Sequence, residues 1–318
     1  MKVLITGGAG FLGSNLVRRC LADSSCRVTV LDSLDPLFHS TTQSLQEVWS
    51  QIRFIRGDIR NETLLAKVVQ DQDVIFHCAA QTSHALSIQY PLLDAEINCL
   101  GSLKLLEAVR LLNPDAVVVY SSSSTVIGKK RTEIADEEHP ERPLEIYSAN
   151  KGVAEKYFRI YHTHYDLKTL VLRFGNLYGP FGKGYSEFGF INYFIHLALK
   201  NQQINIFGDG DQTRNVMFVD DATDLLWQAV QKPRLVGETY LATAPQQLTV
   251  REIAETIVKV FQRGRVRQVE WPEERRRIEI GHVNLSSAKL SASISWEPHY
   301  ELTPGLLRTK AVLEQKGR

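Results

Sequence analysis

The feature that most constrains the fold of this chain is a glycine-rich turn placed directly after a short apolar segment. Residues 2–6, Lys-Val-Leu-Ile-Thr, predict a buried strand. The next residues, Gly7-Gly-Ala-Gly-Phe-Leu-Gly13, lead into an amphipathic helix that runs to about Leu21. A glycine-rich turn at a helix N-terminus lets the backbone approach a pyrophosphate, which the helix amides then bind. The residues expected at this site are Gly7, Gly10, Phe11, Leu12 and Gly13.

An acidic residue at the end of the second predicted strand indicates which dinucleotide is bound. This strand, residues 27–31, is followed by Asp32, which lies 19 residues after Gly13. An acid at this spacing accepts hydrogen bonds from the adenosine ribose diol, and its charge repels a 2′-phosphate. The position therefore predicts NAD rather than NADP. The alternative is that Asp32 caps the loop that it starts.

Strand and helix patterns then alternate through the first 174 residues. Further strands are expected at 52–55, 73–77, 116–120 and 168–173, and the clearest amphipathic helices are 98–110 and 147–165. Such βαβ alternation predicts the α/β class, with a doubly wound parallel sheet of Rossmann type. Ligands of these sheets bind beyond the carboxyl ends of the strands.

Residues that follow the strands are therefore expected to share one rim. Asp58 follows the third strand, where it either accepts from an adenine amine or caps the next helix. Small residues follow the fourth strand and let the backbone lie against a cofactor, and hydroxyls follow the fifth. The rim residues are Gly7, Asp32, Asp58, Ile59, Ala79, Ala80, Gln81, Ser121 and Arg173.

Tyr147 and Lys151 lie four residues apart at the head of the helix expected over 147–165. At this spacing two side chains share one helix face. A free phenol titrates near ~10 and is a poor base at neutral pH, but a nearby ammonium favours the phenolate. The pair is therefore suited to general-base removal of a proton from a sugar or alcohol hydroxyl. Such spacing also arises by chance on many helices, so its meaning depends on the other motifs.

Charge and cysteine content exclude several function classes. The chain has 318 residues and a formal net charge of +1, and its longest basic run is Arg275-Arg276-Arg277. This balance gives no electrostatic basis for binding nucleic acid or an acidic membrane. The four cysteines show no metal-ligand spacing, so no metal is expected. No segment resembles a signal peptide or a membrane span, which predicts a cytoplasmic protein.

With these motifs in order, the chain resembles the extended short-chain dehydrogenase/reductases, in their nucleotide-sugar epimerase/dehydratase branch. The resemblance covers nearly the whole chain and includes the segments 6–13, 77–80, 121–125, 173–180 and 207–214. It implies an NAD-binding Rossmann domain at 1–174, to which segments near 215–243 return. It also implies a smaller mixed α/β lobe at 175–318 that binds a nucleoside diphosphate sugar. The helices over 98–112 and 147–165 are expected to form a four-helix bundle in a homodimer.

The resemblance also assigns roles to individual residues. Tyr147 is the base, Lys151 tunes it and holds the nicotinamide ribose, and Ser123 bridges the sugar hydroxyl to the phenol. Ser122 and Ser124 are the alternatives for the bridging hydroxyl. Asn98 either lies near the cofactor or satisfies a break in its helix. The residues expected to contact substrate are Gln81, Ser83, His84, Ser123, Ser124, Thr125, Tyr147, Phe174, Asn176, Arg214 and Arg276.

Two of these substrate residues have open alternatives. His84 acts as a second acid or base, or it is a solvated loop histidine. Arg276 contacts the diphosphate, because Arg276-x-x-Glu279 matches a family pattern, or it is a solvated charge like Arg275 and Arg277.

The reaction that the sequence favours is epimerisation of a sugar carbinol through a transient keto-sugar. Related 4,6-dehydratases carry an Asp-Glu pair after the active-site hydroxyl, where this chain has Ser124 and Thr125, and no carboxylate lies between Asp115 and Glu133. The expected substrate carbon is C4 of a UDP-hexose or UDP-uronic acid. The alternatives are a dehydratase, a decarboxylase, a CDP-sugar 2-epimerase, or a dinucleotide-binding scaffold without catalysis. Family members read Val-Tyr-Gly where this chain has Val126-Ile-Gly128, which weakens transfer of hexose specificity.

Overall fold

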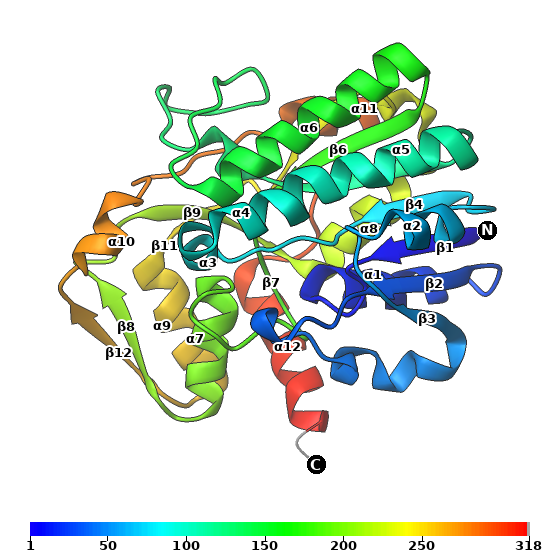
Figure 1. The fold of residues 1–318 in the computed structure, drawn as a ribbon. Coiled ribbons are helices and arrows are strands. Elements are labelled where there is room, and N and C mark those ends of the chain that lie inside the picture. Colours follow the sequence, from blue (N-terminus) through cyan, green and yellow to red (C-terminus); the bar gives the residue numbers. More distant parts are fainter. Residues whose placement is uncertain (317–318) are drawn as a thin grey trace. The chain divides into compact units, whose positions relative to one another are not determined.

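A seven-stranded parallel sheet organises the first of two compact units in the computed structural model, which describes residues 1–316. This unit comprises Met1–Ser123, Ile146–Arg173 and Thr223–Tyr240. The strand order is β3 (Ile52–Arg56), β2 (Arg27–Asp32), β1 (Lys2–Thr6), β4 (Val74–His77), β5 (Val117–Ser123), β6 (Lys168–Phe174) and β10 (Thr239–Ala242). The predicted α/β class with a doubly wound sheet is confirmed (Figure 1).

The strand order places β1 at the centre of this sheet, between β2 and β4. Val3, Leu4 and Ile5 of β1 are fully buried, as expected for an apolar strand covered on both faces. The chain leaves β1 toward β2 and later returns to β4 on its other side. The strands that follow β1 are therefore added first on one side of it, as β2 and β3, and then on the other side, as β4, β5 and β6. Doubly wound sheets bind ligands at such a switch point in the strand order.

Helices cover both faces of the sheet, as right-handed crossovers require. On one face lie α2 (Glu62–Val68), α5 (Ser102–Leu112) and α6 (Ile146–Tyr165) (Figure 1). On the other face lie α1 (Phe11–Leu21), the 3-10 helix η2 (Thr42–Gln51) and part of α8 (Val219–Ala229). Arg19 of α1 forms an ion pair with Asp224 of α8. The shorter elements of the unit are η1 (Pro36–Phe38), α3 (His84–Gln89), α4 (Pro91–Asp94), the π-helix η3 (Ala95–Gly101) and η5 (Pro233–Leu235).

Two elements differ from the sequence prediction. The helix expected over 98–110 is instead the π-helix η3 followed by α5, because Asn98 in η3 is tied to the loop after β4. The strand expected to end at Tyr120 continues through Ser123, so Ser121, Ser122 and Ser123 belong to β5 and only Ser124 follows it. The helix over 147–165 is confirmed as α6, which begins one residue earlier at Ile146.

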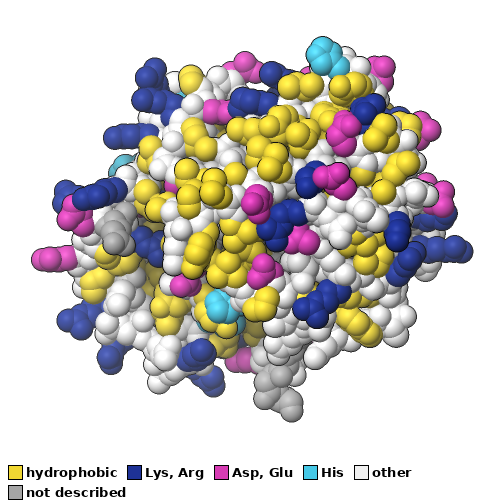
Figure 2. Space-filling view, in the orientation of Figure 1, with side chains coloured by type: hydrophobic (Ala, Val, Ile, Leu, Met, Phe, Trp, Pro, Cys, Tyr) yellow, Lys and Arg dark blue, Asp and Glu magenta, His cyan; other side chains and the backbone are white. Residues whose placement is uncertain are grey.

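Apolar side chains are exposed along the face formed by α4, η3, α5 and α6. Figure 2 shows hydrophobic side chains gathered over α5 and α6. The exposed members on these elements include Leu92, Leu100, Leu111, Leu112, Ile160 and Tyr165. A contiguous apolar surface of this kind commonly marks an interaction site.

The second unit comprises Ser124–Glu145, Phe174–Ala222 and the chain from Leu241 on. Its strands form two small sheets, β11 (Gln247–Thr249), β9 (Thr213–Phe218) and β7 (Asn176–Tyr178), and β12 (Arg265–Val269) with β8 (Gln203–Phe207). Its helices are η4 (Ser124–Ile127), α7 (Phe190–Leu199), α9 (Val250–Phe261), α10 (Glu273–Arg277), α11 (Ala288–Ile294) and α12 (Leu302–Lys316).

Residues Ser124–Glu145 group with this second unit although they precede residue 174. A backbone bridge joins Ala135 to Leu285, and Glu137 accepts a hydrogen bond of 2.6 Å from the Leu241 amide.

Across the described residues, no helix is both long and apolar enough to span a membrane.

Candidate active site

The glycine-rich turn packs so tightly that side chains are excluded at two positions. Gly7 has a φ of +69°, and a Cβ there would lie 2.6 Å from the backbone nitrogen of Ala79. A Cβ on Gly13 would lie 2.2 Å from the carbonyl oxygen of Gly7. Helix α1 then starts at Phe11 with Gly10 as its N-cap and without a side-chain cap. The amides of its first turn, which includes Leu12, are therefore suited to bind a pyrophosphate.

Asp32 is buried at the end of β2 and is oriented by the backbone on both sides. One carboxylate oxygen accepts from the Ala9 amide at 3.0 Å, and the other accepts from the Leu34 amide at 2.9 Å. Carboxylate oxygens accept hydrogen bonds from hydroxyl groups, so a carboxylate at this position suits a ribose diol. The bond to Leu34 also fits the predicted alternative of a loop cap, and the two roles are compatible.

A hollow of about 540 Å³ lies beside Asp32 within the first unit. Its walls come from the loops that follow β2 and β3. The lining residues are Ser33, Leu34, Asp35, Pro36, Arg56, Gly57 and Asp58. Because Asp32 immediately precedes one of these loops, the hollow has the position and size for the adenosine half of a dinucleotide.

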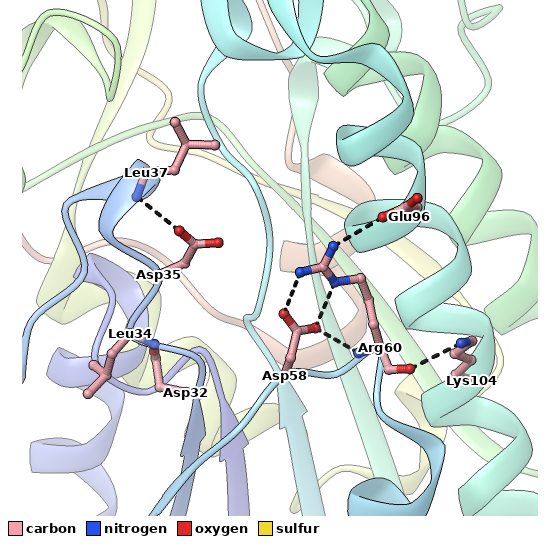
Figure 3. A network of polar contacts seen from close by, with 8 residues as sticks. All are labelled: Asp32, Leu34, Asp35, Leu37, Asp58, Arg60, Glu96 and Lys104. Carbon is pink, nitrogen blue, oxygen red and sulfur yellow. Dashed lines mark hydrogen bonds and ion pairs between the residues drawn. The ribbon is translucent and has the colours of Figure 1, made fainter.

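Asp58 is held by an arginine that sequence reasoning missed (Figure 3). Arg60 binds it through Nε at 3.0 Å and Nη2 at 2.8 Å, and Arg60 also reaches Glu96 of η3 at 3.1 Å. Burial acts to raise the pKa of Asp58, but the hydrogen bonds and charge of Arg60 outweigh it and keep that pKa below its usual value. The helix-cap alternative for Asp58 is wrong, since Asn61 caps α2 by accepting from the Leu64 amide.

Ile59, which is expected to bind the cofactor, follows Asp58 in the loop after β3. Its side chain is buried, and a Cβ added to Gly101 of η3 would lie 2.7 Å from its Cδ1. This side chain therefore packs against η3, and the contact of Ile59 with the cofactor stays a prediction.

The loop after β4 is fixed by side-chain amides. Asn98 binds the main chain of Gln81 twice, accepting from its amide at 3.1 Å and donating to its carbonyl at 2.9 Å. The Gln81 side chain donates to the Ser83 carbonyl at 2.7 Å and to Asp94 at 2.8 Å. Ala79 and Ala80 precede this clamp, and Ala79 lies against Gly7. Asn98 therefore holds the loop that faces the glycine turn.

Gln81 and Ser83 are both buried and bonded within the protein, so their hexose contacts remain predictions. Ser83 caps α3 by accepting from the Leu86 amide at 3.1 Å.

His84 is the first residue of α3, and its ring centre lies 5.2 Å from that of Tyr147. His84 therefore lies in a helix and not in a loop; it is partly exposed and its imidazole packs beside the phenol, and its role as an acid or base stays a prediction.

Tyr147 and Lys151 are buried in the first turns of α6. The Lys151 ammonium donates to the carbonyl oxygen of Ser121 at 2.8 Å and lies 4.1 Å from the centre of the Tyr120 ring. An ammonium has three protons, so two remain for ribose hydroxyls and the phenolate. Ser123 is the last residue of β5, in the same compact unit as Tyr147 and Lys151.

The neighbouring serines have distinct surroundings. Ser121 Oγ donates to the His77 carbonyl at 3.0 Å, so this hydroxyl is used within the sheet. Ser122 Oγ is buried and has no hydrogen-bond partner among the described residues. Ser124 begins the next element, η4, in the second unit.

Burial lowers the pKa of Lys151 to about 8, against the opposing effects of Glu155, Cys78 and Asp94. Burial also lowers the pKa of His77 to about 3, helped by the charge of Lys151, so this imidazole is neutral. The pKa of the Cys78 thiol is raised by burial to about 11, so it is uncharged near neutral pH. Lys151 is therefore the positive charge of this site below about pH 8.

Arg173 lies at the end of β6 as expected, but it forms a buried ion pair and not a rim contact. Its Nη2 lies 2.6 Å from Glu155 of α6, and both side chains are at most 6% exposed. Breaking a buried pair of this kind leaves an uncompensated charge, which is strongly destabilising. Arg173 therefore anchors α6 to the sheet.

The predicted substrate residues of the second unit are distributed over several of its elements. Ser124 and Thr125 start η4, and Phe174 is buried at the end of β6. Asn176 donates to the Asn215 carbonyl across a long 3.5 Å, and Arg276 is exposed on α10. These placements leave the substrate contacts as predictions.

Arg214 is held by residues that the sequence did not connect with it. Its guanidinium lies 2.7 Å from Glu279 and donates to the Gly281 carbonyl at 2.6 Å. In the sequence, Glu279 belongs to the Arg276-x-x-Glu279 pattern. In the structure, it orients Arg214.

Among the described residues no cluster of His, Cys, Asp or Glu is arranged to hold a metal ion.

This fold and site define a dinucleotide-binding protein of the extended short-chain dehydrogenase/reductase class. The chain belongs to the NAD dependent epimerase/dehydratase family, whose model matches residues 3–242. It uses NAD and is an NAD-dependent epimerase or dehydratase. The glycine cradle, the buried Asp32 and the Tyr147–Lys151 pair all fit this cofactor.

Relatives of this chain catalyse more than one reaction. The UDP-glucose 4-epimerase of Mycolicibacterium smegmatis is 31% identical over 323 residues, covering 100% of both chains. The dTDP-glucose 4,6-dehydratase of Xanthomonas campestris pv. campestris is 29% identical over 324 residues, covering 96% of this chain and 91% of the relative. The CDP-paratose 2-epimerase of Salmonella typhi is 32% identical over 257 residues, covering 72% and 75%.

Similar solved structures include 4-epimerases and a 4,6-dehydratase. The UDP-glucose 4-epimerase of Thermotoga maritima with UDP-glucose has a TM-score of 0.89 at 26% identity, covering 100% of both chains. The UDP-glucuronic acid 4-epimerase of Bacillus cereus, in complex with UDP-glucuronic acid and NAD, has a TM-score of 0.87 at 26% identity, covering 99% and 100%. DesIV of Streptomyces venezuelae, a dTDP-glucose 4,6-dehydratase, has a TM-score of 0.90 at 28% identity, covering 100% and 98%.

Proposed function

We propose that this protein is a nucleotide-sugar epimerase that inverts C4 of a UDP-hexose or UDP-uronic acid. The observation that carries the proposal is the Tyr147–Lys151 pair, buried in the compact unit that also holds Ser123 and the glycine turn. Relatives of matching length named as UDP-sugar 4-epimerases support the choice of substrate and carbon.

The chemistry assigned to the residues follows from their charges and contacts. NAD, when bound, would supply the acceptor for the hydride of the sugar carbinol carbon and the donor that reduces the resulting ketone on its opposite face. The Tyr147 phenolate takes the proton of the carbinol hydroxyl and gives it back to the ketone oxygen on reduction, and Ser123 orients that hydroxyl. Lys151 stabilises the phenolate by its positive charge. Contacts with the Ser121 carbonyl and the Tyr120 ring hold its ammonium in place.

The residues after Ser123 favour epimerisation over elimination or decarboxylation. The next segment, Ser124-Thr-Val-Ile127, forms η4 and contains no carboxylate. Elimination of water needs a further acid and base beside the sugar, and this segment supplies neither. The intact Tyr147–Lys151 pair also argues against a scaffold without catalysis.

A screen of nucleotide sugars tests this proposal. The purified protein, with its NAD content measured after denaturation, is incubated with UDP-, CDP-, GDP- and dTDP-sugars, and products are identified by NMR. We expect a C4 epimer from a UDP-sugar. A 4-keto-6-deoxy product would assign a dehydratase, a C2 epimer of a CDP-sugar would assign the 2-epimerase reaction, and bound NAD without any turnover would favour the scaffold.

We expect NAD to bind at least about tenfold more tightly than NADP, because the Asp32 carboxylate repels a 2′-phosphate. Asp32→Ser should narrow this preference, since it removes the charge and both backbone contacts of that carboxylate. Asp23→Ser, which removes a partly exposed charge from the loop before β2, is the control and should leave the ratio of the two affinities unchanged. Fluorescence titration with NAD and with NADP measures the two affinities and so their ratio. Equal affinity of the unaltered protein for NAD and NADP would refute this role of Asp32.

We expect a homodimer in solution, with twice the chain mass of 36.0 kDa. The exposed apolar face on η3, α5 and α6 supplies the surface, through side chains such as Leu100 and Leu111. Leu100→Asp should lower the mass measured by light scattering, because a buried unpaired charge is costly. Leu307→Asp on α12 is the matched control. A single 36.0 kDa particle for the unaltered protein at micromolar concentration would rule the dimer out.

A further inference from the structure

A buried histidine at the end of β4 lies in a chain of hydrogen bonds that none of the proposed catalytic roles uses. His77 is fully buried, and its register partner on β1 is Thr6, which directly precedes the glycine turn. The Thr6 hydroxyl lies 2.8 Å from Nδ1 of His77, and the Ser102 hydroxyl of α5 lies 3.0 Å from Nε2. The imidazole therefore joins the end of β1 to the start of α5.

The partners of the two hydroxyls determine the direction of each bond in this chain. Ser102 donates its only hydroxyl proton to the Asn98 carbonyl at 2.7 Å, so Ser102 Oγ accepts from His77 Nε2. Burial lowers the pKa of His77 to about 3, so the ring is neutral and its Nδ1 carries no proton. Thr6 Oγ1 then donates to Nδ1 and accepts from the Ala79 amide at 3.2 Å. The opposite tautomer would place a bare Nε2 against the Ser102 oxygen.

Both ends of this hydrogen-bond chain hold the loop after β4. At one end Thr6 binds the Ala79 amide. At the other end is Asn98, whose side chain binds the main chain of Gln81 at 3.1 and 2.9 Å. Ala79 is also where this loop meets the glycine turn, because a Cβ on Gly7 would lie 2.6 Å from its nitrogen. The hydrogen-bond chain therefore sets how closely the loop approaches the turn that is suited to bind a pyrophosphate.

We propose that His77, as its Nε2–H tautomer, is a positioning residue for NAD, which holds the loop after β4 in the place against the glycine turn that the cofactor requires. The imidazole acts through Thr6 on one end of the loop and through Ser102 and Asn98 on the other. Binding sites depend on such supporting hydrogen bonds to keep the groups that touch the ligand in position. The inference goes beyond the proposed function, because NAD binding does not depend on which sugar reacts.

Aromatic rings hold the imidazole in one orientation. The ring centre of His77 lies 5.4 Å from that of Tyr120 and 6.2 Å from that of Phe158, and both pairs are stacked. His77→Phe keeps a ring for these contacts and removes both nitrogens. This substitution therefore separates the hydrogen bonds of His77 from its packing.

The first experiment determines the tautomer of His77 by NMR. In protein labelled with nitrogen-15 at histidine, the nitrogen shifts distinguish a protonated ring nitrogen from a bare one. Loss of one set of signals in His77→Phe, or a shift of that set in Ser102→Ala, identifies the residue. Near neutral pH we expect a neutral ring protonated at Nε2. A ring protonated at Nδ1, or at both nitrogens, would overturn the proposal.

The second experiment measures the affinity for NAD by fluorescence titration. His77→Phe should raise the dissociation constant about tenfold, the factor that loss of one hydrogen bond between neutral groups produces. His162→Phe is the matched control, since it removes an imidazole that is bonded to the Leu167 carbonyl at 2.9 Å. Leu167 directly precedes β6, at the opposite rim of the sheet, so this variant should bind NAD unchanged. An unchanged dissociation constant in folded His77→Phe would contradict the role of His77.

A pair of substitutions at Thr6 covers the case in which His77→Phe does not fold. Thr6→Val keeps the shape of the side chain and removes its hydroxyl, whereas Thr6→Ser keeps the hydroxyl. Thr6→Val should weaken NAD binding about tenfold, and Thr6→Ser should bind NAD like the unaltered protein. Equal affinities of the two variants would also overturn the proposal. Where His77→Phe folds, adding Thr6→Val to it should weaken binding little further, because both changes break the same hydrogen-bond chain.

Neither experiment needs a sugar, so failure of this inference is distinguishable from failure of the proposed function. Absence of turnover with every nucleotide sugar would refute the proposed function, while the tautomer and the NAD affinities would still test His77. An enzyme that epimerises a UDP-sugar with His77 protonated at Nδ1 would refute only the inference.

Discussion

Tyr147→Phe should lower turnover by about 10²–10⁴-fold, which is the usual contribution of a positioned general base. The substitution keeps the ring, and with it the packing against His84, but removes the oxygen that accepts the substrate proton. Because only the phenol oxygen is removed, the free energy of unfolding should change by no more than about 1 kcal/mol. The loss should therefore appear in catalysis and not in folding.

Single-turnover kinetics provide the measurement for Tyr147→Phe. NADH absorbance is followed after enzyme and sugar are mixed, and thermal unfolding is recorded alongside. Tyr157→Phe is the matched control, since it removes a phenol oxygen from the same helix, ten residues further along α6. Reduction of bound NAD by Tyr147→Phe at the rate of the unaltered enzyme would show that Tyr147 is not the base.

The sequence predicted the elements whose signals are local. Strand β1 was predicted over its full length, because its apolar run ends directly at Gly7. Asp32 was placed at the end of β2 by its spacing from the glycine turn. These signals depend only on neighbours in the chain, so they can be read without the structure.

Contacts between distant segments were not predictable in the same way. The π-helix η3 shares its apolar residues with an ordinary helix pattern, and it is distinguished by the bonds of Asn98 to Gln81, 17 residues earlier. Arg214 was expected at a phosphate, and its bond to Glu279 spans 65 residues. Nothing in the order of residues indicates such pairings.

The same limit applied to the surroundings of the catalytic pair. Asp94 occupies a position that a helical pattern assigns equally well to the surface, yet it is fully buried between Gln81 and Asn150. His84 follows a polar segment typical of a loop, yet it starts α3 and packs beside Tyr147. Tyr147 and Lys151 were identified by their spacing, but the burial that lowers the pKa of Lys151 is a property of the folded chain.

Lys151→Met should impair both the chemistry and the retention of NAD, because one ammonium is expected to serve both. The substitution preserves much of the side-chain volume and removes the charge that stabilises the Tyr147 phenolate. A nearby opposite charge shifts a pKa by about 1–3 units, so the population of phenolate near neutral pH should fall by about ten- to a thousandfold. Turnover should fall in proportion, and NAD should be lost on gel filtration because the ribose loses its cationic partner.

The pH dependence of Lys151→Met gives the sharper test of its role. In the unaltered enzyme the pKa of Lys151 is lowered by burial to about 8, so its stabilising charge is present below that pH and is lost above it. Without the ammonium, the phenol must ionise unaided at a higher pH, and no lysine remains to lose its proton. The pH–rate profile should therefore move upward and lose the basic limb near pH 8.

Lys156→Met is the control for Lys151→Met, because it removes an ammonium from the same helix that is bonded to the Gly152 carbonyl at 3.1 Å. Its NAD content and pH–rate profile should match those of the unaltered enzyme. NAD is measured by absorbance after gel filtration and denaturation, and turnover is measured by product NMR.

If Lys151→Met kept its NAD and an unshifted pH–rate profile, the ammonium would neither hold the ribose nor tune the phenol. Tyr147 would then need another source of activation, and the His84 ring, 5.2 Å from the phenol ring, would be the next group to test.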